Sequence, residues 1–533
     1  MKKHSAHIAL PIIALAATTA THAATNDRPN VIVILVDDMG YSDIGCYGGE
    51  IPTPNIDKLA KGGTRFTQFY TASRSCPTRA SLMTGLYPHQ TGIGYMTEEP
   101  TAAGAAGASD WGTYGYKGYL NRDCVTLGEV FRESNYHTYM VGKWHLGIHG
   151  EEKYPLQRGF DRFYGILAGA CSYFAPTGAK GLSLDNEKLP TPEAPYYTTD
   201  AFTDYALEFI ESESREDPFF LYLSYNAPHW PLQAKDEDIE KFIDLYRQSG
   251  WNEIRAARLE RMAKMGIVDG EDGFAEWENR NWDELTEQEK DESAYRMATY
   301  AAQVHSVDYN IGRLITHLKK SKQLDNTLIL FLSDNGACAE PYKELGGGAF
   351  DDINNPETGG MISYGRAWAQ VANTPFRKYK RRAYEGGLST SFIVSWRDGF
   401  GNGKGRLCDT PAFLPDIMAT MVDLCDLNYP EQYHGGREIH PMVGTSLRPA
   451  IEDGAKSLHE YMFWEHTKNQ AVRYGDWKAI KDEGKDEWEL YNIKEDRVER
   501  NNLASQQTEL LEKLKTKWSE WATQNYVLPK RAN

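Results

Sequence analysis

Cysteine is scarce in this chain of 533 residues, with seven scattered along it. Small secreted proteins that rely on disulfide bridges pack an even number of cysteines into a short chain, so that class is excluded. One or two bridges stay open, because sequence alone does not pair cysteines. The chain also lacks internal repeats and low-complexity tracts. We therefore expect ordinary globular domains, long enough to bury a large core.

Basic residues are in the minority as well. Lysine and arginine number 58 against 75 aspartates and glutamates, which gives a formal net charge of −17 at pH 7. Nucleic-acid-binding proteins present a basic face, so this balance argues against a nucleic-acid partner. It also disfavours a broad groove for a long polyanion, although a local basic pocket is compatible with an acidic protein.

The body of the chain contains no apolar run long enough to span a membrane. At its start, two lysines precede a short apolar core over residues 8–17, and Thr21-His22-Ala23 offers a cleavage site between small residues. This pattern predicts an export signal peptide over residues 1–23. The first cysteine after that site is Cys46, too distant to carry a lipid. We expect a periplasmic or secreted protein with no membrane anchor.

Apolar runs rich in β-branched residues recur along the chain, and each one ends in polar residues. They cover residues 30–36, 136–141, 219–223 and 327–332. Such runs predict strands buried on both faces, and the helical spacing from Met297 to Leu318 predicts a crossover helix. Open α/β sheets place their ligands just past the ends of such strands. We therefore predict an α/β domain over residues 24–440.

The pattern changes after residue 440. Short strand-like runs, two of them joined by Gly475-Asp476, precede a helix with Leu514 and Trp518 on one face. This predicts a smaller α+β domain over residues 441–533, an antiparallel sheet plus a helix packed on the first domain. Residues 235–295 are rich in charge and helix formers. We interpret them as a surface helical insertion at the rim of the site.

Two pairs of oxygen-bearing side chains follow predicted strands: Asp37-Asp38 and Asp334-Asn335. No histidine or cysteine stands beside them, which suits a hard divalent cation, Ca²⁺ in preference to Mg²⁺, and not Zn²⁺. One such pair is more often a turn or a cap, because Asp and Asn favour turns. Two pairs in one chain, together with the segment that begins at Ser75, favour a metal site.

The most informative segment is Ser75-Cys76-Pro77-Thr78-Arg79, followed by Leu82-Met83-Thr84-Gly85. A serine shortly before a proline is typical of a helix start, and that interpretation is compatible with a chemical role. The segment resembles the signature of type I sulfatases, in which the first residue is converted to formylglycine. The single spacer residue before the proline selects Ser75 for conversion and leaves Cys76 structural.

This resemblance extends over nearly the whole mature chain and implies a fold, a reaction and a partner. The fold is an alkaline-phosphatase-like mixed sheet flanked by helices, and the reaction is hydrolysis of sulfate monoesters. A sulfated serine would be a stable dead end, whereas hydrated formylglycine attacks with one hydroxyl and expels sulfate through the other. The serine-type signature implies a radical maturase as a partner. The implied metal ligands are Asp37, Asp38, Ser75, Asp334 and Asn335.

Five further residues match catalytic positions of the family. Arg79 would brace the hydrated aldehyde. Within Gly142-Lys143-Trp144-His145, the resemblance assigns Lys143 to the sulfate and His145 to the second hydroxyl. His229 would contact the sulfate and protonate the departing alcohol. Lys380 is selected by its spacing from the preceding motif arginine, although two glycines usual in between are replaced here.

Substrate specificity is expected to come from the rim of the site. Candidate rim segments are the 99–120 loop, the 235–295 insertion and residues 465–469. The resemblance places His466 and Asn469 near the leaving alcohol. An exported, acidic and aromatic-rich chain favours exo-action on terminal sulfated sugars of glycans, with sulfated galactose first among them and aryl sulfates as artificial substrates.

Two other functions stay open from the sequence. A phosphomonoesterase or phosphodiesterase of the same fold would need two Zn²⁺ ions, and no Asp-x-x-x-His pair is placed to supply their additional ligands. An inactive glycan-binding homologue would result if Ser75 were never converted. The mass of the peptide that contains Ser75 separates that case from an active enzyme.

Overall fold

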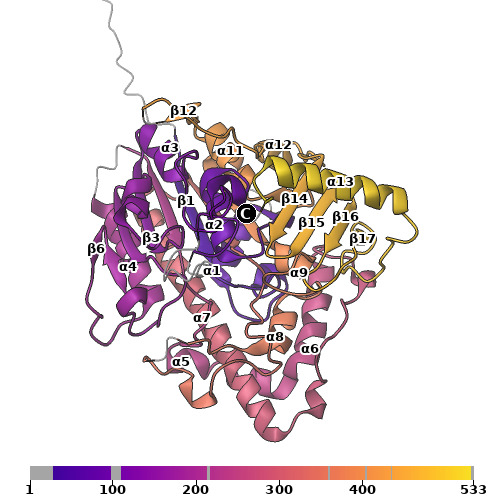
Figure 1. Cartoon of the computed structure of the whole chain (residues 1–533). Helices are drawn as coiled ribbons and strands as arrows, with labels where there is room; N and C mark the ends of the chain where they lie inside the picture. Colours follow the sequence, from indigo (N-terminus) through magenta and orange to yellow (C-terminus); the bar gives the residue numbers. More distant parts are fainter. Residues whose placement is uncertain are drawn as a thin grey trace, which may run out of the picture.

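The computed structural model describes residues 28–97, 110–212, 217–357, 360–401, 405–433 and 435–529. The predicted signal peptide and residues 99–109 of the predicted rim loop lie outside these residues. A large mixed sheet with helices on both faces stands beside a small antiparallel sheet covered by a helix (Figure 1). The structure therefore confirms the predicted α/β fold with a smaller α+β part.

The large sheet is built on four parallel strands at its centre. Strand β1 (Asn30–Val36) pairs in parallel with β7 (Phe219–Ser224) and β8 (Thr327–Ser333), and β7 pairs in parallel with β3 (His137–Lys143). Antiparallel pairing begins at β9 (Ser389–Ser395), which lies beside β8. The outer strands are β2 (Thr64–Tyr70), β4 (Arg162–Ile166), β5 (Leu182–Leu184), β6 (Glu187–Lys188), β10 (Arg406–Cys408) and β11 (Ala412–Phe413).

Successive residues of β1 point into two separate cores, as expected for a strand covered on both faces. Ile32 and Ile34 belong to one core, and Val31 and Val33 to the other. The first core is covered by α1 (Pro54–Gly62), α4 (Thr198–Ser212), α6 (Ile243–Lys264), α7 (Glu287–Lys320) and α8 (Gly365–Ala372). The second is covered by α2 (Ser75–Thr84), α3 (Leu127–Glu133), α11 (Pro415–Leu424) and α12 (Arg448–Glu452).

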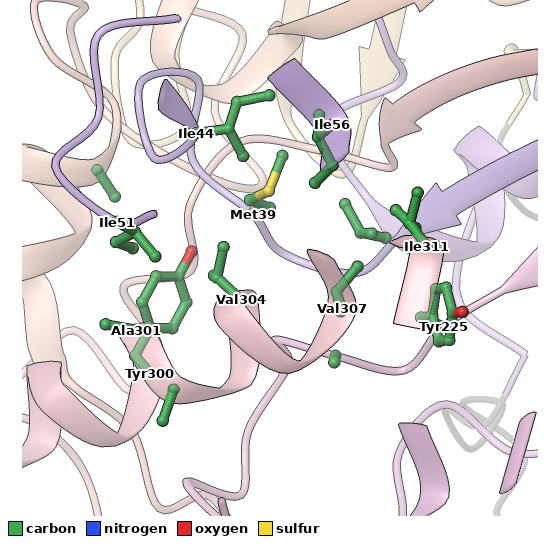
Figure 2. Close-up of a cluster of buried hydrophobic side chains, with 14 of the residues drawn as sticks. Met39, Ile44, Ile51, Ile56, Tyr225, Tyr300, Ala301, Val304, Val307 and Ile311 are labelled. Carbon is green, nitrogen blue, oxygen red and sulfur yellow. The ribbon is translucent and has the colours of Figure 1, made fainter. Parts of the chain in front are cut away.

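Helix α7 contains the crossover helix that the spacing of apolar residues predicts. Its residues Val304 and Val307 lie against Met39 and Ile56, which follow β1 in the chain (Figure 2). These side chains are fully or almost fully buried. The contact fixes the loop after β1, and that loop carries the first pair of predicted metal ligands.

The 235–295 segment is largely helical, as predicted, and it buries an apolar face together with a few polar side chains. It contains α5 (Asp236–Ile239), α6 and the start of α7. On α6, Trp251 and Arg258 are completely buried. Arg258 donates to Asp43 at 2.7 Å and to Glu50 at 2.7 Å. Helix α6 thus keeps one face exposed, while the buried arginine on its inner face pairs with carboxylates that lie far away in the sequence.

The small sheet comprises β14 (Tyr461–His466), β15 (Asn469–Tyr474), β16 (Trp477–Lys481) and β17 (Glu489–Asn492), and α13 (Thr508–Gln524) packs on it. This sheet begins at Tyr461, whereas Leu447 and Ile451 still pack in a core of the large sheet. The remaining short elements are α9 (Glu385–Leu388), α10 (Arg397–Phe400), β12 (Gln432–Tyr433) and β13 (Arg437–Glu438).

All seven cysteines lie in the described residues, where they are buried and unbridged. A search of the described helices finds none that combines the length and the apolar character of a membrane span. The fold is therefore held by the two cores of the large sheet, by the core of the small sheet and by buried polar contacts, with no disulfide bridge.

Candidate active site

The ends of β1 and β8 bring the two predicted ligand pairs together. Val36 and Ser333 are register partners in these parallel strands, so Asp37 and Asp334 leave the sheet side by side. The backbone N–H of Asp38 donates to Asp334 Oδ1 at 3.1 Å, and Asn335 Nδ2 donates to Asp38 Oδ1 at 2.7 Å. All four side chains are buried. The predicted convergence of the two pairs is present.

Three buried cationic side chains face this group of carboxylates. Lys143 Nζ lies 2.6 Å from Asp37 Oδ2, and Lys143 itself is the last residue of β3. Lys380 Nζ lies 2.8 Å from Asp38 Oδ1. Arg79 Nη2 lies 3.1 Å from Asp334 Oδ2. Burial of charge is tolerated only with partners, so each predicted cation serves the cluster as a counterion.

The crowding of carboxylates shows in their pKa values. Burial and the charge of Asp334 raise the pKa of Asp37 to about 8, against the opposing effect of Lys143. For Asp38, burial is outweighed by Lys380 and His229, which hold its pKa below the usual range. Arg79 likewise lowers the pKa of Asp334 against burial. The three cations therefore keep Asp38 and Asp334 ionised, whereas burial beside Asp334 makes Asp37 the carboxylate that is hardest to ionise.

Two oxygens of the cluster have no hydrogen-bond partner within the described parts of the chain. They are Asp37 Oδ1 and Asn335 Oδ1, and both are buried. Buried acceptors without a partner are rare in folded proteins. Carboxylate and amide oxygens are the ligands that Ca²⁺ and Mg²⁺ prefer. One ligand atom each from Asp37, Asp38 and His229 also lie within 4.8 Å of one another. These residues fit a hard divalent cation.

Ser75 stands at the edge of this cluster as the first residue of α2. Its Oγ accepts a hydrogen bond from Arg79 Nε at 2.9 Å. Arg79 also donates to Ser224 Oγ and to the Lys143 carbonyl, so one arginine ties Ser75 to the ends of β7 and β3. A helix N-terminus favours an anion, so the helix-start and chemical interpretations of Ser75 are compatible.

The two predicted histidines lie on the same side of the sheet edge. His229 Nε2 is 3.4 Å from Asp38 Oδ2, and its Nδ1 is 2.6 Å from the Trp230 carbonyl. Burial lowers the pKa of His229 to about 3 although Asp38 opposes the shift. The neutral ring therefore donates from Nδ1 to the carbonyl and directs Nε2 into the cluster. His145 follows Lys143 by two residues and is buried.

His466 and Asn469 lie farther out, as register partners at the turn between β14 and β15. The ring of Tyr95 stacks on His466 with centroids 5.5 Å apart and an interplanar angle of 12°. The next residue, Met96, accepts from Arg74 Nε at 3.3 Å, immediately before Ser75. The link from the predicted substrate residues to the catalytic centre thus runs through the segment that starts at Tyr95.

Sequence reasoning missed several residues that hold this site. Ser224 anchors Arg79, and only its position at the end of a predicted strand could have indicated a role. Glu340 contacts Arg74 at 2.5 Å and approaches Lys380 to 3.9 Å. It lies in a loop without a recognisable motif, so the sequence held no signal for it.

Comparisons with known proteins identify the family of this chain. The Sulfatase family model matches residues 29–427. An uncharacterised sulfatase of Schizosaccharomyces pombe is 33% identical over 95% of both chains, and an arylsulfatase of Klebsiella aerogenes is 34% identical over 80% of this chain and 92% of its own. Ps i-CgsB, solved in complex with k-i-k-neocarrahexaose, has a TM-score of 0.68 at 28% identity and covers 95% of this chain and 94% of its own. The chain therefore belongs to the formylglycine- and metal-dependent sulfatase family and is a sulfuric ester hydrolase.

Proposed function

We propose that this protein is an exported exo-acting sulfatase that removes sulfate from terminal sulfated sugars of glycans. It would use formylglycine made from Ser75 and one Ca²⁺. The proposed use of formylglycine and Ca²⁺ rests on one observation, the buried cluster beside Ser75. In this cluster, Asp37 Oδ1 and Asn335 Oδ1 lack hydrogen-bond partners among the described residues. Oxygen ligands with no cysteine suit Ca²⁺.

Each residue of the cluster has a proposed role that follows from its position. Asp37, Asp38, Asp334 and Asn335 would hold the cation, which when bound supplies charge that activates the attacking hydroxyl. Arg79 fixes the side chain of residue 75 through the 2.9 Å hydrogen bond. Lys143 and Lys380 bring positive charge to the position where the sulfate oxygens accumulate negative charge. His229 directs Nε2 toward the cluster, and this nitrogen would have to take up a proton before it could pass one to a departing alcohol.

A sugar substrate is supported by the aromatic side chains around His466. Tyr95 packs against Trp111 with centroids 4.7 Å apart, and Trp111 stacks on Tyr116 at 4.9 Å. Aromatic faces of this kind suit the apolar faces of sugar rings. The complex of Ps i-CgsB with a neocarrahexaose points in the same direction. Sulfated galactose is the first sugar to test.

The test begins with the mass of the peptide that contains Ser75, which must show loss of two hydrogens in active preparations. Monosulfated sugars, with galactose sulfates among them, are then assayed beside an aryl sulfate for the native enzyme and for His466→Ala. We expect the variant to lose more kcat/KM on sugars than on the aryl ester. Activity with unconverted serine would contradict the formylglycine step. Equal losses on both substrates would contradict the sugar assignment.

A further inference from the structure

A second polar cluster lies directly outside the catalytic centre, on residues that neighbour Ser75 and Lys380 in the chain. Arg74 precedes Ser75 as the residue before the first turn of α2. Arg381 follows Lys380, and its backbone N–H donates to the Ser73 carbonyl at 2.7 Å. The two arginines therefore start from adjacent points of the backbone, while their chain neighbours point into the centre.

Each arginine is held by one carboxylate and is still accessible from solvent. Arg74 Nη1 lies 2.5 Å from Glu340 Oε1, and Arg381 Nη2 lies 2.9 Å from Glu483 Oε1. The arginine side chains are 14% and 29% exposed. Against the effect of burial, Arg74 and Lys380 lower the pKa of Glu340 to about 2, so it stays ionised. These ion pairs orient both guanidinium groups and leave part of each free to bind a ligand.

Two buried donors in this cluster have no partner in the described part of the molecule. They are the hydroxyl of Tyr342 and Nε of Arg381. Tyr342 follows Glu340 by two residues, and its ring centroid lies 5.8 Å from that of Tyr379, which directly precedes Lys380. Buried donors are almost always bonded in folded proteins. Both atoms can donate, so the complementary group is an acceptor oxygen brought by a ligand.

The backbone holds this cluster in conformations that side-chain-bearing residues rarely adopt. The φ angles of Ser73, Tyr342 and Arg381 are 57°, 68° and 79°, all in the left-handed region. Such conformations persist only where the surrounding structure imposes them, and they gather at functional sites. The surrounding structure therefore fixes the backbone at these three residues.

We propose that Arg74, Arg381 and Tyr342 form a subsite for a second anionic group of the substrate, a sulfate or carboxylate near the sulfate ester that is cleaved. The subsite rests on the proposed function, because the cleaved sulfate must lie at Ser75. Guanidinium groups bind such oxyanions through charge-assisted hydrogen bonds, which are stronger than bonds to a neutral hydroxyl. The preferred substrate is then a doubly anionic sugar rather than a singly sulfated one.

The experiment compares matched substrates in the formylglycine-containing enzyme. One pair is an aryl sulfate with and without a ring carboxylate, and the other is a sulfated sugar with and without a second sulfate. The measured quantity is the ratio of kcat/KM between the doubly and singly charged member. We expect Tyr342→Phe and Arg381→Gln to lower this ratio about tenfold, mainly through KM, as for loss of one charge-assisted hydrogen bond.

Two control variants make the same chemical changes away from the cluster. Tyr309→Phe removes the hydroxyl of a tyrosine that is 59% exposed on α7. Arg397→Gln removes an exposed arginine that pairs with Asp325 at 2.9 Å, beyond the opposite end of β9 from the site. Both controls should keep the native ratio. Thermal melting of each variant shows whether it has folded. If Arg381→Gln does not fold, Tyr342→Phe alone tests the proposal.

The outcomes separate the subsite from the proposed function. Unchanged ratios in both variants, or equal losses on singly and doubly charged substrates, would overturn the subsite. If a substrate with a neutral hydroxyl in place of the second anionic group gains as much kcat/KM, the subsite does not select an anion and that part of the proposal is overturned. If only the aryl pair is cleaved and its ratio responds to the variants, the subsite stands and the sugar substrate of the proposed function fails.

Discussion

Two clusters of buried charge in this molecule differ in how completely their polar atoms are bonded. The catalytic cluster keeps Asp37 Oδ1 and Asn335 Oδ1 without partners among the described residues. The other cluster lies between the large sheet and the small sheet and consists of Glu385, Lys478, Arg497 and Glu499; we call it the interdomain cluster. In it, Lys478 Nζ donates to Glu385 and Glu499 at 2.9 Å each.

The remaining carboxylate oxygens of the interdomain cluster are also bonded. Glu385 Oε2 accepts from Arg497 Nε at 3.2 Å, and Glu499 Oε2 accepts from the backbone N–H of Glu385 at 2.8 Å. This cluster joins the large domain to β16 and the segment after β17. Burial of charge is therefore common to both places, and only the unsatisfied acceptors distinguish the site that is built for a ligand.

The largest expected effect is on catalysis. Asp37→Asn keeps the size of the side chain and removes one ligand charge, so kcat/KM should fall by at least about 10³-fold. Steady-state kinetics on an aryl sulfate measures the loss. Ser81→Ala on α2 is the control, because it deletes a buried hydrogen bond to the Leu86 carbonyl outside the cluster. Its activity should stay within a few-fold of native, and comparable losses in both variants would contradict the special role of the cluster.

A substitution in the interdomain cluster should lower the stability of the protein and leave the activity of the folded fraction unchanged. Lys478→Met leaves two buried glutamates without their shared cation, which costs about 3–5 kcal/mol of unfolding free energy. Urea unfolding measures the loss, and the folded fraction should still be active. Lys494→Met is the matched control, because its pair with Asp476 is 74% and 55% exposed and contributes under about 1 kcal/mol. Equal stability of the two variants would refute the difference drawn between the clusters.

The sequence predicted the catalytic cluster far better than its surroundings. Asp37 and Asp334 were found because polar residues after parallel strands must meet at one edge of a sheet. Lys478 carried no such signal, because its partners Glu385 and Glu499 lie on other elements of the chain. For the same reason, the buried Arg258 of α6 resembled a surface residue. Local periodicity predicts elements, whereas pairing between distant charges depends on how those elements pack.

Metal binding should stabilise the protein through the catalytic cluster alone. A cation at a concentration a hundredfold above its Kd adds about 2.7 kcal/mol to the unfolding free energy. Melting in chelator, Ca²⁺ and Mg²⁺ should therefore give the highest midpoint with Ca²⁺ for the native protein and for Lys494→Met. Asn335→Ala should lose most of this increase, because one oxygen ligand is gone. An equal increase in that variant would place the cation elsewhere, and a larger effect of Zn²⁺ would contradict the choice of metal.

The pH dependence of stability is expected to come from the interdomain cluster. Burial and the charge of Glu385 raise the pKa of Glu499 to about 7, although the charge of Lys478 acts to lower it. The unfolded chain releases this proton near its ordinary value, so between the two pKa values the folded state holds one proton more. Stability from this group therefore falls as pH rises, by up to about 1.4 kcal/mol per pH unit, and levels off above pH 7.

Glu499→Gln removes that titration while it keeps the size of the side chain. Relative to native protein, the unfolding free energy of the variant should be similar at pH 5 and should rise progressively toward pH 8. Glu512→Gln on α13 is the control, because Glu512 is 66% exposed and its loss should leave the pH profile parallel to native. Parallel profiles for Glu499→Gln as well would mean that both glutamates stay ionised beside Lys478. In that case each cluster would hold equal numbers of opposite charges, two of each sign in the interdomain cluster and three of each sign in the catalytic one. The completeness of the hydrogen bonds in the interdomain cluster would then be the whole of the difference between them.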